Sequence, residues 1–275
     1  MSWLAVRVRP GAGSDRGDAL AALFALGSEG VHETGDELVT HFPGDADEAA
    51  IVAAVRAADC AAEVTSSLIP EVDWATEWKK GVGAHELGSL AIVPPWLAEG
   101  RDPARTIVIE PQMAFGTGEH QTTRGVVRLL PAVIRVGDRV ADLGSGSAVL
   151  SIAAIKLGAA HVTAIEIDHD SIENAHENVG RNGVADRIAI FEGDAFVLLP
   201  LVAPVRVILA NIISSVLLDL LPTIAASLTG DGEAIISGIL LEEREMMLNE
   251  LDDRGWNVLA HDAEGLWWSA RIARR

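Results

Sequence analysis

The chain has 275 residues, 49% of them hydrophobic, so it is long enough for one large domain or two modest ones with a sizeable core. Its 40 acidic residues outnumber 21 basic ones, which disfavours non-specific nucleic-acid binding and leaves two interpretations, attraction of a basic partner or solubility alone. The one cysteine, Cys60, excludes an internal disulfide and predicts a reducing, cytoplasmic location. We expect neither a signal peptide nor a membrane span, and no direct nucleic-acid partner.

Residues 1–68 are predicted to form a small separate domain. Their strands and helices alternate in the order β-α-β-β-α-β, which is typical of the ferredoxin-like α+β fold. Ser14 or Asp15 can cap the first helix, and a Thr-Gly-Asp turn joins the two central strands. The predicted elements are a strand over 3–9, a helix ending near Gly27, strands over 31–33 and 37–42, a helix over 45–58 and a strand over 61–68.

Residues 69–104 are predicted to form a linker helix and connector that begins at Pro70. Trp74 and Trp78 stand one helical turn apart and would share one face of that helix. We expect this face to pack against a domain, and a direct substrate contact is the alternative. A short strand over 90–93 ends at a pair of prolines.

Residues 105–275 are predicted to form an α/β domain with a doubly wound, mainly parallel sheet, because apolar strands alternate with long helices. In such sheets the ligand lies outside the carboxyl ends of the strands, where the strand order reverses. The predicted strands cover residues 106–109, 139–143, 162–167, 188–192, 205–210, 233–237, 256–260 and 267–272.

A glycine-rich turn over 144–148 follows the second of these strands, and an acid, Glu166, stands at the end of the next. Gly144 and Gly146 allow a ligand to approach the backbone, and Glu166 can accept hydrogen bonds from ribose hydroxyls. The spacing disfavours a dinucleotide, whose third glycine would fall at Val149. No Lys or Arg lies between residues 140 and 155 to pair with a pyrophosphate, so the turn favours S-adenosylmethionine, which carries none. The alternative is an ordinary strand-to-helix turn.

Three other segments complete the predicted site. The segment 110–123, EPQMAFGTGEHQTT, suggests a lid whose threonines cap the next helix, with a capped surface loop as the alternative. Asn211 follows a strand that would neighbour the glycine turn, where its amide could hold an amine; the alternative is a helix cap. Asp194 could accept a bond from an adenine amino group or be a simple loop acid. His85 and His120 have no partner at metal-ligand spacing, so we expect no metal.

At these residues the chain closely resembles the bacterial PrmA family, the methyltransferases of large-subunit ribosomal protein eleven. The matching segments are AFGTGEHQTT, DLGSGSAVLSIAAIKLGA, AIEID, ANI before LLP, DWATEW and the C-terminal LWWSARIARR. The resemblance implies the class I S-adenosylmethionine-dependent methyltransferase fold and a substrate-recognition domain at the N-terminus. It also implies N-methylation of lysine side chains and of the N-terminal amine. Carried over by motif, the cofactor contacts are Thr123, Gly144, Glu166 and Asn211.

The sequence departs from the family pattern in three places. Ala148 stands where the family has glycine, and Glu166 stands where it usually has aspartate. Gln112, Met113 and Glu119 differ from the family's lid, and these differences bear on the substrate more than on the reaction.

We therefore predict a protein N-methyltransferase that acts on a basic ribosomal protein. A neutral amine would attack the sulfonium methyl in line, so alignment would supply most of the rate gain. The lysine side chain in water has a pKa of about 10.4, so the site must favour its neutral form; no residue stands out as a base. Two alternatives stay open: a methyltransferase of the same fold for another protein or a small molecule, and a non-catalytic scaffold that binds the cofactor.

Overall fold

The computed structural model describes residues 2–28, 30–69, 78–112 and 114–275. Its contacts divide the chain into two compact units, Met1–Gly81 and Val82–Arg275. Trp74 of the predicted linker helix and Met113 of the predicted lid lie outside the described residues. No helix in the described part of the chain has the length and apolarity that a membrane span requires.

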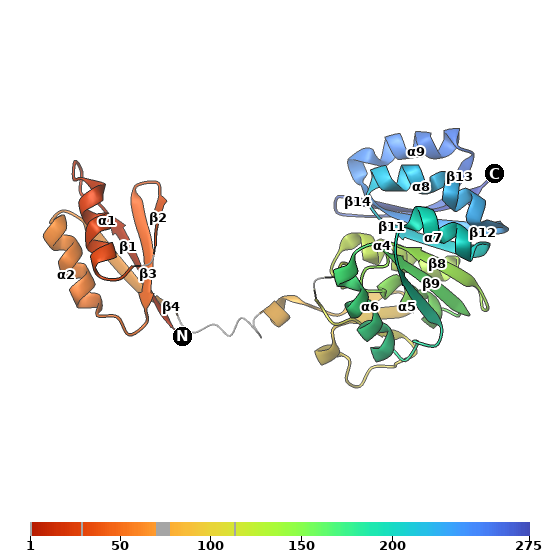
Figure 1. Cartoon of the computed structure of the whole chain (residues 1–275), viewed down its shortest axis with the longest axis horizontal. Coiled ribbons are helices and arrows are strands. Elements are labelled where there is room, and N and C mark those ends of the chain that lie inside the picture. The colour runs from red at the N-terminus through yellow and green to blue at the C-terminus, as the bar shows by residue number, and fades with distance from the viewer. Residues whose placement is uncertain (1, 29, 70–77, 113) are drawn as a thin grey trace. The chain divides into compact units, whose positions relative to one another are not determined.

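The first unit is a four-stranded antiparallel sheet with two helices packed on one face (Figure 1). Its strand order, β2-β3-β1-β4, confirms the predicted ferredoxin-like fold. Asp15 caps the first helix by accepting a hydrogen bond from Gly17 N. The elements are β1 (Trp3–Arg9), α1 (Arg16–Ala25), β2 (Val31–Thr34), β3 (Glu37–Pro43), α2 (Glu48–Ala58) and β4 (Glu63–Ile69).

The second unit is built on a seven-stranded sheet of order β10-β9-β8-β11-β12-β14-β13. The first five strands run parallel, and β14 is antiparallel to both of its neighbours. The strand order reverses between β8 and β11, which confirms the predicted doubly wound, mainly parallel sheet. The strands are β8 (Arg139–Leu143), β9 (His161–Glu166), β10 (Ile188–Glu192), β11 (Val205–Asn211), β12 (Leu228–Leu240), β13 (Trp256–Glu264) and β14 (Trp267–Arg274).

Helices cover both faces of this sheet (Figure 1). One apolar core lies between the sheet and α4, α5 and α6, and the other lies between the sheet and α7, α8 and α9. Successive strand residues alternate between the two cores, so Val140 enters the first and Ala141 the second. The helices are α4 (Gln121–Leu129), α5 (Val149–Lys156), α6 (His169–Arg181), α7 (Ala195–Val202), α8 (Ser214–Ser227) and α9 (Arg244–Asp253).

The strand predicted over 106–109 does not join the main sheet. It forms β7 (Thr106–Val108) of a separate three-stranded sheet with β5 (His85–Leu87) and β6 (Leu90–Val93). Ile92 and Ile107 of this sheet are fully buried in the same core as α4 and α5. Part of the predicted connector therefore packs with the second unit. Four short 3₁₀ helices complete the described chain: Trp78–Gly81, Pro95–Leu97, Leu130–Ala132 and Leu241–Glu243.

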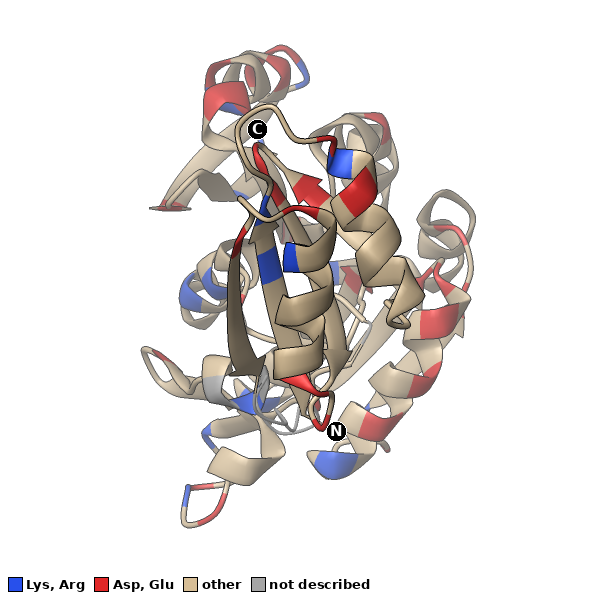
Figure 2. Ribbon diagram, turned by 90° about the vertical axis from the view of Figure 1, so that its left-hand side faces the viewer, with Lys and Arg blue, Asp and Glu red and all other residues tan. Residues whose placement is uncertain are grey.

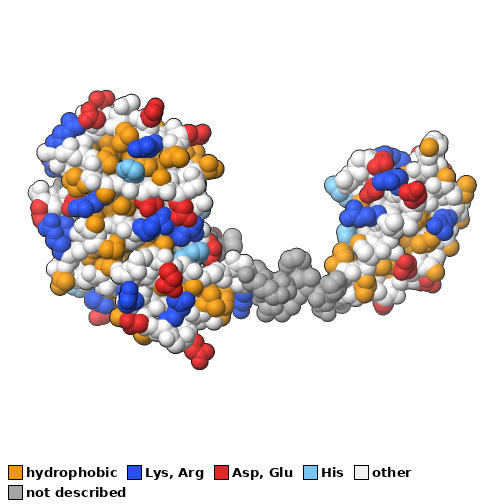
Figure 3. Space-filling view, turned by 180° about the vertical axis from the view of Figure 1, so that it is seen from behind, with side chains coloured by type: hydrophobic (Ala, Val, Ile, Leu, Met, Phe, Trp, Pro, Cys, Tyr) orange, Lys and Arg blue, Asp and Glu red, His pale blue; other side chains and the backbone are white. Residues whose placement is uncertain are grey.

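Acidic residues are spread over many helices and loops rather than gathered in one cluster (Figure 2). On the surface, Lys and Arg side chains commonly lie next to Asp or Glu (Figure 3). Arg135, for example, pairs with Asp231 at 2.7 Å, and both side chains are exposed. Exposed pairs of this kind contribute little to stability, about 0–1 kcal/mol each.

Candidate functional site

The glycine-rich turn after β8 leaves no room for larger side chains. Gly144 and Gly146 have left-handed φ angles of 68° and 50°. A Cβ atom at Gly144 would lie 2.6 Å from Cγ2 of Ile212, and one at Gly146 would lie 2.4 Å from the carbonyl oxygen of Phe115. The turn therefore presents bare backbone at the carboxyl end of β8, where this fold class binds its ligands.

Ala148 has the backbone conformation that glycine favours. Its φ is 64°, the one positive value at a non-glycine residue in the described part of the chain. The residue is fully buried directly before α5. A left-handed conformation costs an L-residue about 1–2 kcal/mol, so Ala148 keeps the turn at the expense of some backbone strain.

Glu166, the last residue of β9, stabilises the glycine-rich turn through hydrogen bonds. Its Oε2 accepts a hydrogen bond from Gly146 N at 2.7 Å, and its Oε1 accepts one from Asp168 N at 2.9 Å. The side chain is only 7% exposed. A carboxylate has about four acceptor positions, so lone pairs remain for ribose hydroxyls. The structure thus brings Glu166 and Gly146 into direct contact.

An apolar slot of about 110 Å³ opens beside the turn. Gly144 lines one side, and Gly193, Asp194 and Phe196 line another. Asp194 is the N-cap of α7 and bonds to Phe196 N at 2.8 Å, so it has a structural role as well as its predicted one. An apolar slot with a carboxylate among its lining residues suits a purine ring with an exocyclic amino group.

The predicted lid rests on the glycine-rich turn. Ser147 N donates to Phe115 O at 2.9 Å, and Ser147 Oγ donates to Gly116 O at 2.8 Å. Asn178 of α6 joins the two segments, because it accepts from Glu110 N at 2.9 Å and donates to Ser147 O at 3.2 Å. The base of the lid and the turn are therefore held by one buried side chain.

The helix after the lid begins differently from the prediction. His120, not Thr122 or Thr123, caps α4, which starts at Gln121. Both threonines are instead buried in its first turn, where α4 packs on the sheet. The Thr123 hydroxyl is fully buried and has no hydrogen-bond partner within the described residues.

A second cavity of about 240 Å³ lies under the lid. Asn211, at the end of β11, lines it, and β11 pairs directly with the glycine-turn strand as predicted. The helix-cap alternative for Asn211 is wrong, because α8 starts at Ser214 and its N-cap is Ile213. Ile212 lines both this cavity and the slot, so the two are neighbours with one shared wall.

His120 is the titratable side chain of this second cavity. Its ring lies between Phe115 and Trp267, with centroid distances of 4.9 Å to each. Nδ1 is 2.7 Å from Thr122 Oγ1. Burial, reinforced by the positive charge of Arg124, lowers the pKa of His120 below its usual value. The imidazole is therefore neutral at neutral pH.

Comparison with known proteins assigns the chain to a family. Residues 21–275 match the family model for ribosomal protein L11 methyltransferase (PrmA). The chain belongs to this family. A relative from Desulforamulus reducens is 36% identical over 73% of this chain and 65% of its own length. A Clostridium perfringens relative is 35% identical over 72% of this chain and 63% of its own. Both are named ribosomal protein L11 methyltransferase, and the match spans less than two thirds of each.

A solved structure supports the fold. The ribosomal protein L11 methylase from Lactobacillus delbrueckii subsp. bulgaricus is 33% identical, with a TM-score of 0.62. The match covers 70% of this chain and 98% of that one. This PrmA chain therefore has the class I methyltransferase architecture that the resemblance implied.

Two side chains of the PrmA site carry little signal in the sequence. The sequence places His120 in the predicted lid and offers it no metal-ligand partner, although its place before two threonines at a helix start could have indicated a cap. Trp267 comes from the last strand and carries no local signal for the site. In the described residues no group of three His, Cys, Asp or Glu could hold a metal ion.

Proposed function

We propose that this chain transfers methyl groups from S-adenosylmethionine to amines of a large-subunit ribosomal protein. The observation that carries the proposal is the shared wall at Ile212 between the slot and the cavity that Asn211 lines. Two neighbouring sites that meet at the end of β11 suit a two-substrate transfer. Family membership supports the reaction and the protein substrate.

The residues present fit the cofactor. A Cβ atom at Gly144 or Gly146 would collide with Ile212 or Phe115, so both positions need glycine and the turn presents bare backbone to a ligand. Glu166 has acceptor positions left for a ribose diol, and the slot beside Asp194 suits adenine. Thr123 offers its unpartnered hydroxyl. When bound, S-adenosylmethionine supplies an electrophilic methyl group on a sulfonium.

The second cavity suits a lysine side chain. Phe115, Ile213 and Trp267 offer apolar surface to its methylene groups. The same surface disfavours the ammonium form, because burial penalises the charged state. The Asn211 amide can orient the amine with its lone pair toward the methyl group. The amine nitrogen then forms the new N–C bond while the C–S bond breaks and sulfur keeps the electron pair.

The transferred amine loses one proton, and we assign its acceptance to His120. Nδ1 either accepts from Thr122 N as the cap of α4 or, when protonated, donates to Thr122 Oγ1. In the second tautomer the lone pair on Nε2 is free to receive the proton. The lowered pKa keeps the ring neutral before the reaction. His120 would thus supply the base that the sequence did not reveal.

We assign substrate recognition to the first unit. Residues 1–65 carry 11 acidic and four basic residues, and none of the cofactor motifs lies there. Such a surface attracts a basic protein, and salt weakens the attraction over about 8–10 Å. The predicted cytoplasmic location agrees with a ribosomal substrate and stays a prediction.

The test uses the full chain, S-adenosylmethionine with a deuterated methyl group and purified L11 protein. Intact-mass and peptide mass spectrometry should find the label on lysine side chains or the N-terminal amine. Asn211→Ala and His120→Gln should lose at least about tenfold in turnover, whereas Asn257→Ala on the exposed face of β13 should not. If S-adenosylhomocysteine binds but the L11 protein gains no mass, the proposed reaction is wrong. The chain is then either a non-catalytic scaffold that binds the cofactor or a methyltransferase for another substrate.

A further inference from the structure

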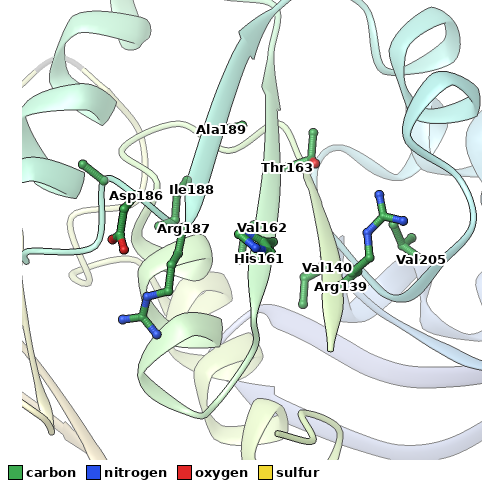
Figure 4. A pocket seen from close by; sticks show the side chains of 11 residues that line it. Arg139, Val140, His161, Val162, Thr163, Asp186, Arg187, Ile188, Ala189 and Val205 are labelled. Atoms are coloured by element: carbon green, nitrogen blue, oxygen red, sulfur yellow. The ribbon is translucent and has the colours of Figure 1, made fainter. Parts of the chain in front are cut away.

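A groove of about 380 Å³ lies at the opposite edge of the main sheet from the candidate site (Figure 4). It is formed where β8, β9, β10 and β11 begin, whereas the candidate site lies where these strands end. The five residues of β8 rise about 3.3 Å each, so roughly 15 Å separates the two edges. The groove therefore takes no part in methyl transfer.

Three basic side chains form a row across this groove. Arg139 pairs in register with His161, and Arg187 stands in the turn directly before β10, whose first residue, Ile188, pairs with Val162. Residues in register on parallel strands project from the same face, about 4.8 Å apart. Arg139 and His161 thus project from the face opposite to Val140 and Val162, which enter the core shared with α4, α5 and α6.

The two arginines of this row have no acidic partner. Most arginines of this acidic chain pair with Asp or Glu, but Arg139 and Arg187 form no ion pair within the described residues. Arg139 donates one hydrogen bond, to Val202 O at 3.3 Å. Their guanidinium groups point toward opposite ends of the groove, with His161 between them (Figure 4). Each end therefore offers a cation with unused donors.

We propose that this groove binds a ribose flanked by two phosphate groups, as in a nucleoside 3′,5′-bisphosphate. Arg139 and Arg187 can each engage one phosphate through two parallel N–H bonds. Asp186, the carboxylate of the lining, can accept a bond from a ribose hydroxyl, and Thr163 adds a hydroxyl to the floor. The volume lies within the range of small-molecule sites, about 300–1,000 Å³.

A free nucleotide fits this chain better than a long RNA. The net charge of −19 repels a polyanion over its length, whereas a small ligand meets only the two local arginines. The same two-phosphate chemistry also occurs in a single RNA strand, so the experiment includes both sources.

The experiment titrates full-length protein with uridine 3′,5′-bisphosphate, uridine monophosphate and uridine by calorimetry. Saturating S-adenosylhomocysteine is present, so nucleosides cannot enter the methyltransferase site. We expect the bisphosphate to bind about tenfold tighter than the monophosphate, because it engages both ends of the row. Arg139→Gln and Arg187→Gln should each remove this advantage. Arg56→Gln, an exposed arginine of α2 with no ion pair among the described residues, is the charge-matched control and should keep it.

Hexauridylate, a short RNA strand, shows whether the natural ligand of the groove is a free nucleotide or single-stranded RNA. Binding that is tighter than that of the bisphosphate and still needs Arg139 and Arg187 would assign the groove to RNA; weaker binding would assign it to a free nucleotide. The proposal fails if uridine binds as well as the bisphosphate, if Arg56→Gln weakens binding as much as Arg187→Gln, or if no phosphate ester binds at millimolar concentration. Thermal unfolding of each variant shows that it is folded.

Discussion

Glu166→Gln should weaken both cofactor binding and the fold. In the structure the two carboxylate oxygens accept from Gly146 N and Asp168 N at 2.7 and 2.9 Å, in a side chain that is 7% exposed. The glutamine amide must place its NH₂ group against one of these N–H groups, so one buried donor loses its acceptor. A hydrogen bond to a charged group contributes about 1.5–3 kcal/mol, and an unsatisfied buried donor costs about 1–3 kcal/mol.

We therefore expect the free energy of unfolding to fall by about 2 kcal/mol. The affinity for S-adenosylhomocysteine should fall about 10- to 100-fold, since the ribose hydroxyls lose a charged acceptor. Urea unfolding followed by circular dichroism measures the first quantity, and calorimetry measures the second.

Glu192→Gln is the matched control. Glu192 is the in-register neighbour of Glu166 on β10, but it is exposed and bonds to the His169 side chain. Glu192→Gln should change the free energy of unfolding by less than about 0.5 kcal/mol. Equal stability and equal affinity in Glu166→Gln and Glu192→Gln would refute the role assigned to Glu166.

Three other predictions concern the turn, the buried acid and the cavity. Burial raises the pKa of Asp142 to about 7, above its unfolded value of about 3.9, so its contribution to stability is lost as pH rises from 4 to 7. Asp142→Asn should flatten this dependence, and urea unfolding at pH 5 and pH 8 checks it. Ala148→Gly relieves backbone strain of about 1–2 kcal/mol in the folded protein. Two effects oppose this gain: a buried methyl group worth about 0.8 kcal/mol is lost, and the conformational entropy of the unfolded chain rises. The variant's stability should stay within about 1 kcal/mol of wild type while cofactor affinity is equal or higher; a large loss of affinity would contradict the assigned turn geometry. Asn211→Ala should lower kcat more than cofactor affinity, because orientation acts in the transition state. Survival of kcat within about twofold in steady-state assays would place the amine elsewhere.

Local patterns were enough to predict most of the architecture. Both units, the ferredoxin-like order and the parallel sheet follow from periodicity and turn residues, because strands and helices bury one face at fixed intervals. The contact between Glu166 and the glycine-rich turn was also predictable. An acid at the end of one parallel strand must lie beside the turn that follows its neighbour.

Other features needed contacts between distant segments. The strand over 106–108 reads like any other apolar strand, and only the burial of Ile107 against α4 and α5 assigns it to a separate sheet. His120 gains its lowered pKa from burial between Phe115 and Trp267, whose position 147 residues later no local pattern reveals. Arg139, His161 and Arg187 line one groove only because β8 and β9 pair in register and the turn before β10 reaches the same edge of the sheet. The sequence alone thus determined the strands, the turns and the family, since these depend on neighbouring residues. The cavity, the base and the basic groove were decided by the tertiary structure, because register and burial arise only when the strands meet.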